Sequence, residues 1–173
     1  MTVHIRTLSE ADAASYRSLR LRGLREHPEA FSSSYEEECE RSLHDVAARL
    51  RASDLGVAFG AFVGEQLAGS VGVYRDRHRK LAHRAMLVGM YVAPEHRKLS
   101  IGRALVERAV QHATTVLRAR QVVLGVGADN AAAIALYRGV GFEPFGVERD
   151  YLFADGQYHD EMHMIRFLYG TAR

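Results

Sequence analysis

One stretch of the sequence, from residue 86 to residue 117, constrains the fold more than any other, because a strand pattern there gives way to a helix pattern. The run MLVGMYV at 86–92 is continuously apolar and is closed by Ala93 and Pro94, and proline cannot donate to a strand ladder. After a short basic loop, apolar residues recur every four positions, as on an amphipathic helix: Ile101, Leu105, Ala109, Ala113 and Leu117. The stretch therefore predicts a buried strand, a loop and a helix that packs on a sheet.

The loop, RKLSIG from Arg97 to Gly102, has a composition suited to binding phosphate. The first amides of a helix have no partner within the helix, and the helix dipole makes that end electropositive. Arg97 and Lys98 add two cations, and Gly102 lets a ligand approach the backbone. The structural alternative is that Ser100 is an ordinary N-cap and the two cations lie on a solvated turn. The residues of the loop leave both interpretations open.

Together with the strand end Met90, Tyr91 and Val92, this loop resembles the acyl-CoA signature of the GCN5-related N-acetyltransferase (GNAT) superfamily. The signature is Arg or Gln, two variable residues, Gly, one variable residue and Gly or Ala, after a strand that ends in an L-x-V pattern. Ser100 stands in place of the first motif glycine, and Lys98 stands where another glycine is frequent. A positive φ would cost a serine roughly 1–2 kcal/mol. We therefore expect either a negative φ at Ser100 or a slightly remodelled loop, and the Ser100 hydroxyl is free to contact a phosphate.

A second segment, NAAAIALYRGVGF at 130–142, matches the family's second signature at every place. That signature is Asn, two residues, Ala, two residues, Leu-Tyr, three residues and Gly-Phe. The matching residues are Asn130, Ala133, Leu136, Tyr137, Gly141 and Phe142. The resemblance implies an α/β (α+β) fold with a mixed, mostly antiparallel sheet that is splayed between its fourth and fifth strands and flanked by helices. It implies a single N-acetyltransferase domain over residues 1–173.

The other segments predict elements in an order that agrees with this fold. Alternating patterns predict strands at 3–7, 57–63, 67–74, 121–126, 143–153 and 157–167. A helix is expected from Ser9 until His27 and Pro28 stop it, and a second is expected to start within 29–40 and continue through Leu50. Gly89 predicts either a bulge in its strand or packing relief. The basic run at 75–84 is expected to form the exposed tip of a strand connection, with contact to an acidic partner or to an outlying CoA phosphate as the alternatives.

Composition excludes several classes of protein. A chain of 173 residues with 47% hydrophobic composition suits one domain. A formal charge of +2 with intermixed signs gives no nucleic-acid surface. Cys39, the single cysteine, excludes an internal disulfide and fits a reducing compartment. The chain lacks the apolar core of a signal peptide and any run of ~20 apolar residues, so we expect a cytoplasmic protein without membrane association.

The resemblance also assigns a cofactor site. Acetyl-CoA is the expected co-substrate, with its pantetheine arm bound by the main chain of Met90 and Val92, and no metal is expected. A metal site at His159, Glu161 and His163, which alternate on one predicted strand, is the weaker interpretation, because nothing else supplies an open catalytic site. The residues expected to contact the cofactor are Met90, Tyr91, Val92, Arg97, Lys98, Leu99, Ser100, Ile101, Gly102, Arg103, Asn130 and Tyr137.

Tyr137 is the expected catalytic residue, with its hydroxyl beside the CoA sulfur. A phenol with a pKa of ~10 is a weaker acid than a thiol with a pKa of ~8.5, so Tyr137 is expected to act chiefly by donating a hydrogen bond to the developing thiolate. The structural alternative is a packed aromatic side chain on a short helix. For Asn130 the alternatives are a helix N-cap and a hydrogen bond to the cofactor or acceptor, and both can hold.

The acceptor side is less defined. In the superfamily the connection between the first two helices commonly lines the acceptor pocket, and here that implies Phe31, Tyr35, Glu37 and Glu38; the alternative is the solvated start of a helix. The strand at 86–92 holds no carboxylate, so the general base is unassigned between Glu37, Glu38 and a water chain. A cationic small amine, an amino-acid-like substrate and a peptide N-terminus all remain candidate acceptors.

The function predicted from the sequence is acetyl-CoA-dependent N-acetylation of a primary amine by direct attack in a ternary complex. Cys39 lies far in sequence from both motifs, so no acyl-enzyme is suggested. The alternative from another class is a non-catalytic acyl-CoA-binding or sensing module. A doubly wound nucleotide-binding domain would need a Gly-rich loop after the first strand, and HIRTLSEAD at 4–12 contains none. A homodimer is an expectation from the family alone.

Overall fold

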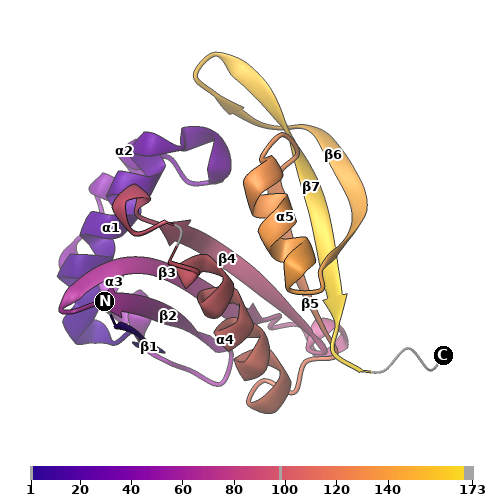
Figure 1. Cartoon of the computed structure of the whole chain (residues 1–173), viewed down its shortest axis with the longest axis horizontal. Helices are drawn as coiled ribbons and strands as arrows, with labels where there is room; N and C mark the ends of the chain where they lie inside the picture. The colour runs from indigo at the N-terminus through magenta and orange to yellow at the C-terminus, as the bar shows by residue number, and fades with distance from the viewer. Residues whose placement is uncertain (1, 98, 170–173) are drawn as a thin grey trace.

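The computed structural model describes residues 2–97 and 99–169, and in that part of the chain seven strands form one sheet in the order β1-β2-β3-β4-β5-β7-β6 (Figure 1). Only the β4–β5 pair is parallel, and every other neighbouring pair is antiparallel. This is the mixed, mostly antiparallel sheet that the sequence predicts. The strands are β1 (Val3–Thr7), β2 (Gly56–Val63), β3 (Gln66–Arg75), β4 (Arg84–Val92), β5 (Gln121–Gly127), β6 (Glu143–Ala154) and β7 (Gln157–Phe167).

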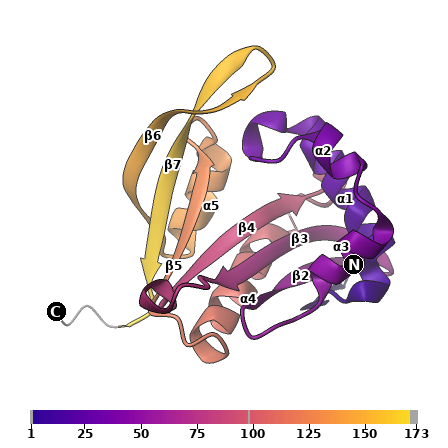
Figure 2. The same cartoon turned by 180° about the vertical axis from the view of Figure 1, so that it is seen from behind.

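The helices lie on both faces of the sheet. α4 and α5 lie in front of the strands in Figure 1 and behind them in Figure 2, whereas α1, α2 and α3 gather at the other side of β2–β4. The helices are α1 (Ala13–Glu26), α2 (Tyr35–Cys39), α3 (Leu43–Leu50), α4 (Ile101–Thr115) and α5 (Ala131–Gly139). None of the helices in the described part of the chain is long and apolar enough to cross a membrane.

Two hydrophobic clusters hold these layers together, and β2 contributes to both. Phe59 and Ala61 belong to the cluster beneath α4, whereas Ala58 and Phe62 belong to the cluster beneath α1 and α3. Successive side chains of a strand point to opposite faces, so a central strand covered on both sides is apolar at nearly every position. The strand predicted at 57–63 is confirmed, but its VAFGAFV run is apolar on both faces rather than on one, because both faces of β2 are covered.

The β4–β5 pair separates soon after it begins. Only Arg84–Met86 pair with residues 121–123, and the two strands then diverge. Further along β4, Gly89 has a φ of 61° and the register with β3 shifts, so that Tyr91 faces Ser70 while Val88 faces Gly72. A Cβ atom at Gly89 would meet nothing within 4 Å. Gly89 therefore forms the bulge, and the packing-relief interpretation is wrong.

Most of the predicted elements are confirmed, including the turns at Gly64 and Asp155 that join β2 to β3 and β6 to β7. The connection at 76–83 between β3 and β4 is largely exposed, as expected for the basic run. The single second helix was wrong, because α2 and α3 are separate. Ser42 lies between the two helices and begins α3, because its side chain accepts the Asp45 amide at 3.1 Å and caps that helix.

Candidate active site

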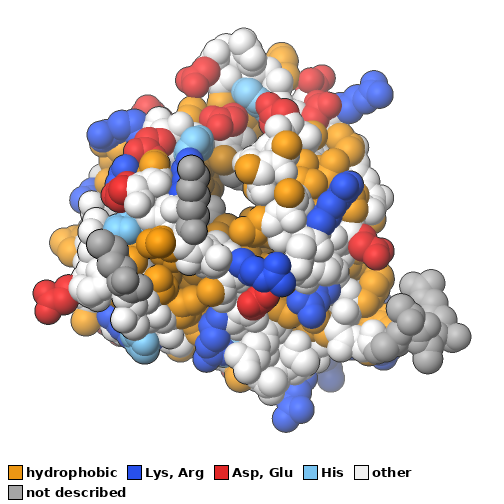
Figure 3. Space-filling view, in the orientation of Figure 1, with side chains coloured by type: hydrophobic (Ala, Val, Ile, Leu, Met, Phe, Trp, Pro, Cys, Tyr) orange, Lys and Arg blue, Asp and Glu red, His pale blue; other side chains and the backbone are white. Residues whose placement is uncertain are grey.

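A cleft of about 700 Å³ opens where β4 and β5 diverge. The space-filling view is hollowed between the α1–α2 region and α5, and hydrophobic side chains form part of the rim of the hollow (Figure 3). The cleft is lined by residues 87–92 of β4, 100–103 at the start of α4, 125–127 of β5 and one face of α5. Both sequence motifs, although about thirty residues apart, therefore line one cleft.

One wall of this cleft is the edge of β4 that faces β5. Beyond Met86 this edge pairs with no described strand, so its main-chain groups lie open to the cleft. An unpaired strand edge can accept an extended ligand as an added strand. At the end of the edge, Arg97 folds back: its Nε donates to the Val92 carbonyl at 3.2 Å, and one of its terminal nitrogens lies 3.1 Å from His27 Nε2. Tyr91 also lines the cleft, and its hydroxyl points to the α1 side, where it donates to Glu26 at 2.5 Å.

The start of α4 forms the neighbouring wall. Ser100 has a φ of 57° and its side chain makes no capping hydrogen bond. The expectation of a negative φ at this residue was therefore wrong, as was the ordinary N-cap interpretation, because the side chain caps nothing. The serine adopts the left-handed conformation that a glycine would adopt freely. Leu99 is exposed, Ile101 is buried, and Lys98 lies outside the described residues.

Ser100→Gly is expected to raise the free energy of unfolding by about 0.5–1 kcal/mol, because relief of the left-handed strain exceeds the entropy that glycine adds to the unfolded chain. Denaturant titration of both proteins measures this difference. Ser100→Ala is the matched control, since it removes the hydroxyl and keeps the strain. A stability gain in Ser100→Ala as large as that in Ser100→Gly would show that strain is not the cause.

Gly102 sits where α4 comes closest to the cleft. A Cβ atom there would lie 3.1 Å from Leu136 Cδ1 and 3.2 Å from Met90 Cε, so the space holds a glycine and little more. Arg103, the next residue, is exposed and its Nε pairs with Glu107 Oε1 at 2.8 Å. The first turn of α4 thus presents its free amides to the cleft without a side chain at position 102 to cover them.

α5 contributes Tyr137 and Asn130 to the cleft. Tyr137 is 7% exposed, its ring meets Phe142 edge to face at 5.9 Å, and burial raises the pKa of its hydroxyl to about 12. Asn130 caps α5 by accepting the Ala133 amide at 3.1 Å, so its N-cap role is confirmed while it also lines the cleft. The Tyr137 side chain is therefore a protonated donor under ordinary conditions.

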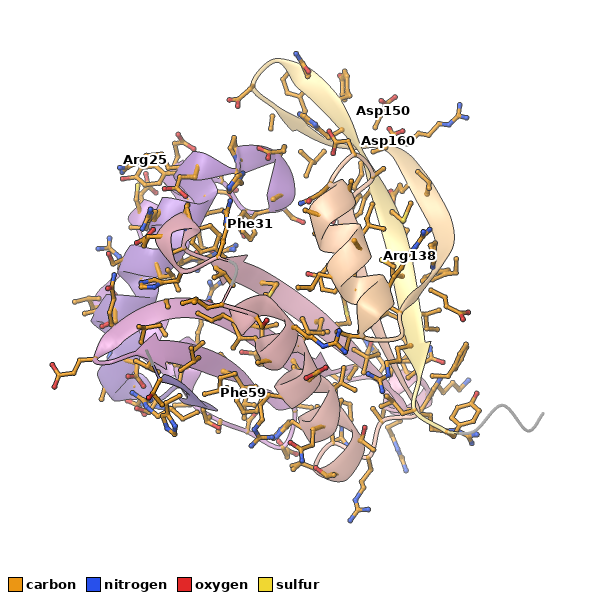
Figure 4. The ribbon with its side chains drawn as sticks, viewed as in Figure 1. Arg25, Phe31, Phe59, Arg138, Asp150 and Asp160 are labelled. Carbon is orange, nitrogen blue, oxygen red and sulfur yellow. The ribbon has the colours of Figure 1, made fainter. Side chains whose placement is uncertain are left out.

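Of the four predicted acceptor residues, only Phe31 lines the cleft. Figure 4 shows it between the α1–α2 region and the sheet. Tyr35 hydrogen-bonds to Arg25 at 2.6 Å, and Arg25 lies on the outer side of α1 in the same view. Glu37 accepts the Ser34 amide at 2.8 Å and closes the start of α2.

Glu38, the fourth, is 8% exposed and is held by two arginines, at 3.1 Å from Arg41 and 3.4 Å from Arg49. It lines a smaller cavity on the α1–α3 side of β4. In the polar segment at 31–38, Glu37 therefore caps a helix and Glu38 forms ion pairs, and only Phe31 of the predicted acceptor residues lines the cleft.

Another carboxylate, Glu161 on β7, lies next to the cleft residue Gly125 of β5 without lining the cleft itself. A Cβ atom at the cleft residue Gly125 would clash with the Glu161 carboxylate, so this group covers that part of β5. Burial raises the pKa of Glu161, and His163 Nδ1 lies 3.6 Å from it. His163 Nε2 in turn lies 3.2 Å from Glu148 Oε2, which makes a chain of titratable groups leading to the surface.

The sequence pattern groups Glu161 with His159 and His163, as the weaker metal-site interpretation, and does not connect it with the cleft. No group of side chains suited to holding a metal ion occurs among the described residues. The period-2 pattern predicts that these side chains share a face, and the β5–β7 register, in which Gly125 faces His163 and Gly127 faces Glu161, places that face beside two cleft residues although Glu161 and His163 do not themselves line the cleft. No motif in the sequence signals that register.

Comparison with known proteins agrees with this geometry. The family model described as "Acetyltransferase (GNAT) family" matches residues 21–142. The spermidine N(1)-acetyltransferase of Vibrio cholerae is 32% identical over 82 residues, which cover 47% of each chain. The N-alpha-acetyltransferase RimI of Mycobacterium tuberculosis is 36% identical over 98 residues, covering 56% of this chain and 58% of that protein. The chain thus spans about half the length of the curated relatives it matches.

Solved structures match the fold over nearly the whole chain. A GNAT-family acetyltransferase from Streptococcus pneumoniae superposes with a TM-score of 0.86 at 22% identity, covering 96% of this chain and all of that one. The yncA protein of Salmonella typhimurium, solved with its cofactor acetyl-CoA, gives a TM-score of 0.80 at 19% identity and covers 100% of this chain and 98% of that one. At these identities the likeness shows the fold alone.

Proposed function

Because this chain belongs to the acetyltransferase (GNAT) family, we propose that it transfers an acetyl group from acetyl-CoA to a primary amine, by direct attack with both substrates bound together. One observation carries the proposal: the open edge of β4 ends beside the free amides of α4, in a cleft that also holds a buried tyrosine. Relatives named for acetylation of spermidine and of α-amino groups support transfer to nitrogen.

The residues of the cleft fit an acyl-CoA. Met90 and Val92 offer main-chain groups along the open edge of β4 to an extended arm, and the first amides of α4 suit its phosphates. Gly102 keeps the approach clear, since a Cβ there would already press on its neighbours. When bound, acetyl-CoA supplies the thioester that the amine attacks.

Tyr137 stabilises the departing sulfur in this proposal. Because burial raises its pKa to about 12, the phenol keeps its proton and acts by donating a hydrogen bond. Burial is the one cause of that raised pKa, and no hydrogen bond from the described residues contributes to it. The hydroxyl is therefore free to donate to a ligand in the cleft.

Glu161 is the proposed general base. An amine with a pKa near ~10.4 arrives protonated, so the chain must accept a proton before attack. Burial raises the pKa of Glu161 above its ordinary value and so strengthens it as a base, whereas the Ser34 amide and hydroxyl lower the pKa of Glu37. The proton then passes towards His163, which lies 3.6 Å away.

Glu161→Gln is expected to lower kcat/KM at neutral pH by about 10²-fold, at the low end for a general base because water can partly replace it. A carboxylate accepts a proton only when ionised, so wild-type activity falls as the pH drops through the raised pKa of Glu161. This acidic limb should be absent from the variant's pH profile. A variant that retained the wild-type limb would exclude Glu161 as the base.

The experiment that tests the function has two parts. Titration calorimetry measures acetyl-CoA binding, and a thiol-release assay measures turnover with a panel of primary amines. Binding together with amine-dependent thiol release supports the proposal. Binding without release on any amine favours a non-catalytic acyl-CoA sensor, and absence of binding overturns the cofactor site.

We also propose that residues 1–173 form a single domain, that the protein is a homodimer and that it is cytoplasmic. One continuous sheet over the described residues supports the single domain. Large apolar side chains are exposed on β6 and β7 and support a dimer contact there: Phe145, Val147, Phe153, Tyr158 and Phe167. The single cysteine, Cys39, is unpaired, in keeping with a reducing compartment.

A further inference from the structure

A second cavity, of about 240 Å³, lies beside the cleft on the α1–α3 side of β4. Val88 and Gly89, the residues of the β4 bulge, line both spaces. Arg20 and Phe31 connect them as well, because the Arg20 guanidinium lies over the Phe31 ring at 4.5 Å while Phe31 itself lines the cleft. The two spaces are therefore separated by one aromatic ring and one strand bulge.

The smaller cavity is positively charged. Arg17, Arg20 and Arg49 line it together with one carboxylate, Glu38. That carboxylate is already neutralised, since Arg49 lies 3.4 Å and Arg41 3.1 Å from its oxygens. Arg17 and Arg20 thus face the cavity with no anion of their own among the described residues.

These two arginines also have unused hydrogen-bond donors. Arg17 donates through one terminal nitrogen to the Cys39 carbonyl at 2.7 Å, but its Nε is buried without a partner among the described residues. One terminal nitrogen of Arg20 is buried and unpartnered in the same sense. Burial lowers the pKa of Arg20, whose side chain is partly buried. A buried guanidinium left in this way is costly unless an anion occupies the cavity.

We propose that the cavity lined by Arg17, Arg20 and Arg49 binds the acidic group of the acceptor, so that the substrate is a small amine carrying a carboxylate or a phosphonate. This rests on the function proposed above. Guanidinium groups bind both kinds of oxyanion through paired N–H donors. An acceptor anchored there extends its amine past Phe31 into the cleft.

A cavity of this charge is unsuited to a polyamine acceptor. The same arginines repel a polycation, and the glutamates that would have attracted one are engaged elsewhere: Glu37 caps α2 and Glu38 is paired. A protein N-terminus also fits poorly, because the carboxyl group of its first residue is an amide.

The test compares acceptors that share a skeleton: β-alanine, 2-aminoethylphosphonate and β-alaninamide, with L-amino acids and their amides as a wider set and spermidine as the polycation. Thiol release is expected to favour the acids over the matched amides by about 10- to 100-fold in kcat/KM, the range for a charged hydrogen bond. Arg20→Met should remove this preference by raising the KM for the acids, and Arg20→Lys should restore part of the preference. Arg77→Met, at an exposed position of the β3–β4 connection, is the control that changes net charge equally.

Nitrogen-15 NMR of the arginine Nε–H groups supplies a readout that needs no turnover. Addition of the acids, but not of the amides, should shift Nε–H signals of the cavity arginines. Arg17→Met and Arg20→Met assign these signals, since each variant lacks one of them. If either variant fails to fold, Arg49→Met assigns the signal of the third arginine instead. Equal turnover of acids and amides without such shifts overturns the anion site and leaves the acetyltransferase intact. Failure of acetyl-CoA to bind overturns the proposed function, while the NMR shifts still decide the anion site.

Discussion

Gly102→Glu is expected to weaken acetyl-CoA binding by at least about 10³-fold, because it places a carboxylate among the amides proposed to hold phosphate, and opposed like charges cost several kcal/mol. The new side chain starts in a crowded position, since a Cβ atom at position 102 would lie 3.1 Å from Leu136 Cδ1 and 3.2 Å from Met90 Cε. Helix α4 itself should tolerate the change, because an acidic residue in the first turn interacts favourably with the helix dipole. Calorimetric titration measures the loss of affinity, and circular dichroism verifies the fold.

Two variants separate charge from bulk in this prediction. Gly102→Ala adds only the Cβ, whose nearest neighbours are the ends of flexible side chains, so affinity should fall about tenfold or less. Gln111→Glu adds the same charge to an exposed position of α4 far from its first turn and should leave affinity unchanged. Wild-type affinity in Gly102→Glu would mean that the phosphates bind elsewhere.

Local patterns in the sequence were enough to predict the β4 and α4 walls of the cleft. The strand end at 90–92, the loop and the four-residue repeat of α4 are contiguous, and α5 begins just after Asn130, where this capping residue predicts it. The bulge at Gly89 was one of two interpretations, and only the β3–β4 register decided between them. The splay of the sheet followed from the family resemblance, because the point where β4 and β5 diverge carries no local signal.

The acceptor side shows why the rest was not predictable. Glu37 and Glu38 stand in a polar segment, and composition alone does not tell a free carboxylate from one that caps a helix or pairs with arginine. Arg17, Arg20 and Arg49 come from α1 and α3, and only the packing of these helices brings them to one cavity. Each of these contacts joins residues whose spacing along the chain follows no motif.

The β4 bulge gives the two spaces a common wall. Gly89 lies between them with its α-carbon uncovered, so an acceptor held on one side can meet an acyl group held on the other. In the proposed reaction, a strand without a carboxylate can therefore still serve the transfer. The strand supplies main chain, and the charged groups come from the helices and from β7.

Tyr137→Phe is expected to lower kcat by about 10³-fold and to leave the acetyl-CoA dissociation constant within a factor of about two, because the hydroxyl acts on the leaving sulfur and adds little in the ground state. The ring should stay in place, since the substituted phenylalanine would keep the edge-to-face contact with Phe142. Steady-state kinetics with thiol detection and calorimetry on the same samples measure the two quantities. Tyr158→Phe removes an exposed hydroxyl on β7 and should change neither.

The pH dependence of kcat tests whether Tyr137 keeps its proton in the range where activity is measured. A phenol with a pKa of about 12 stays protonated from pH 8 to pH 10, so any fall of wild-type kcat in this range should persist in Tyr137→Phe. A basic limb that vanished in the variant would instead show Tyr137 titrating within that range. Equal loss of kcat and of acetyl-CoA affinity would make Tyr137 a packing residue, because a donor to the leaving sulfur lowers the barrier without holding the cofactor.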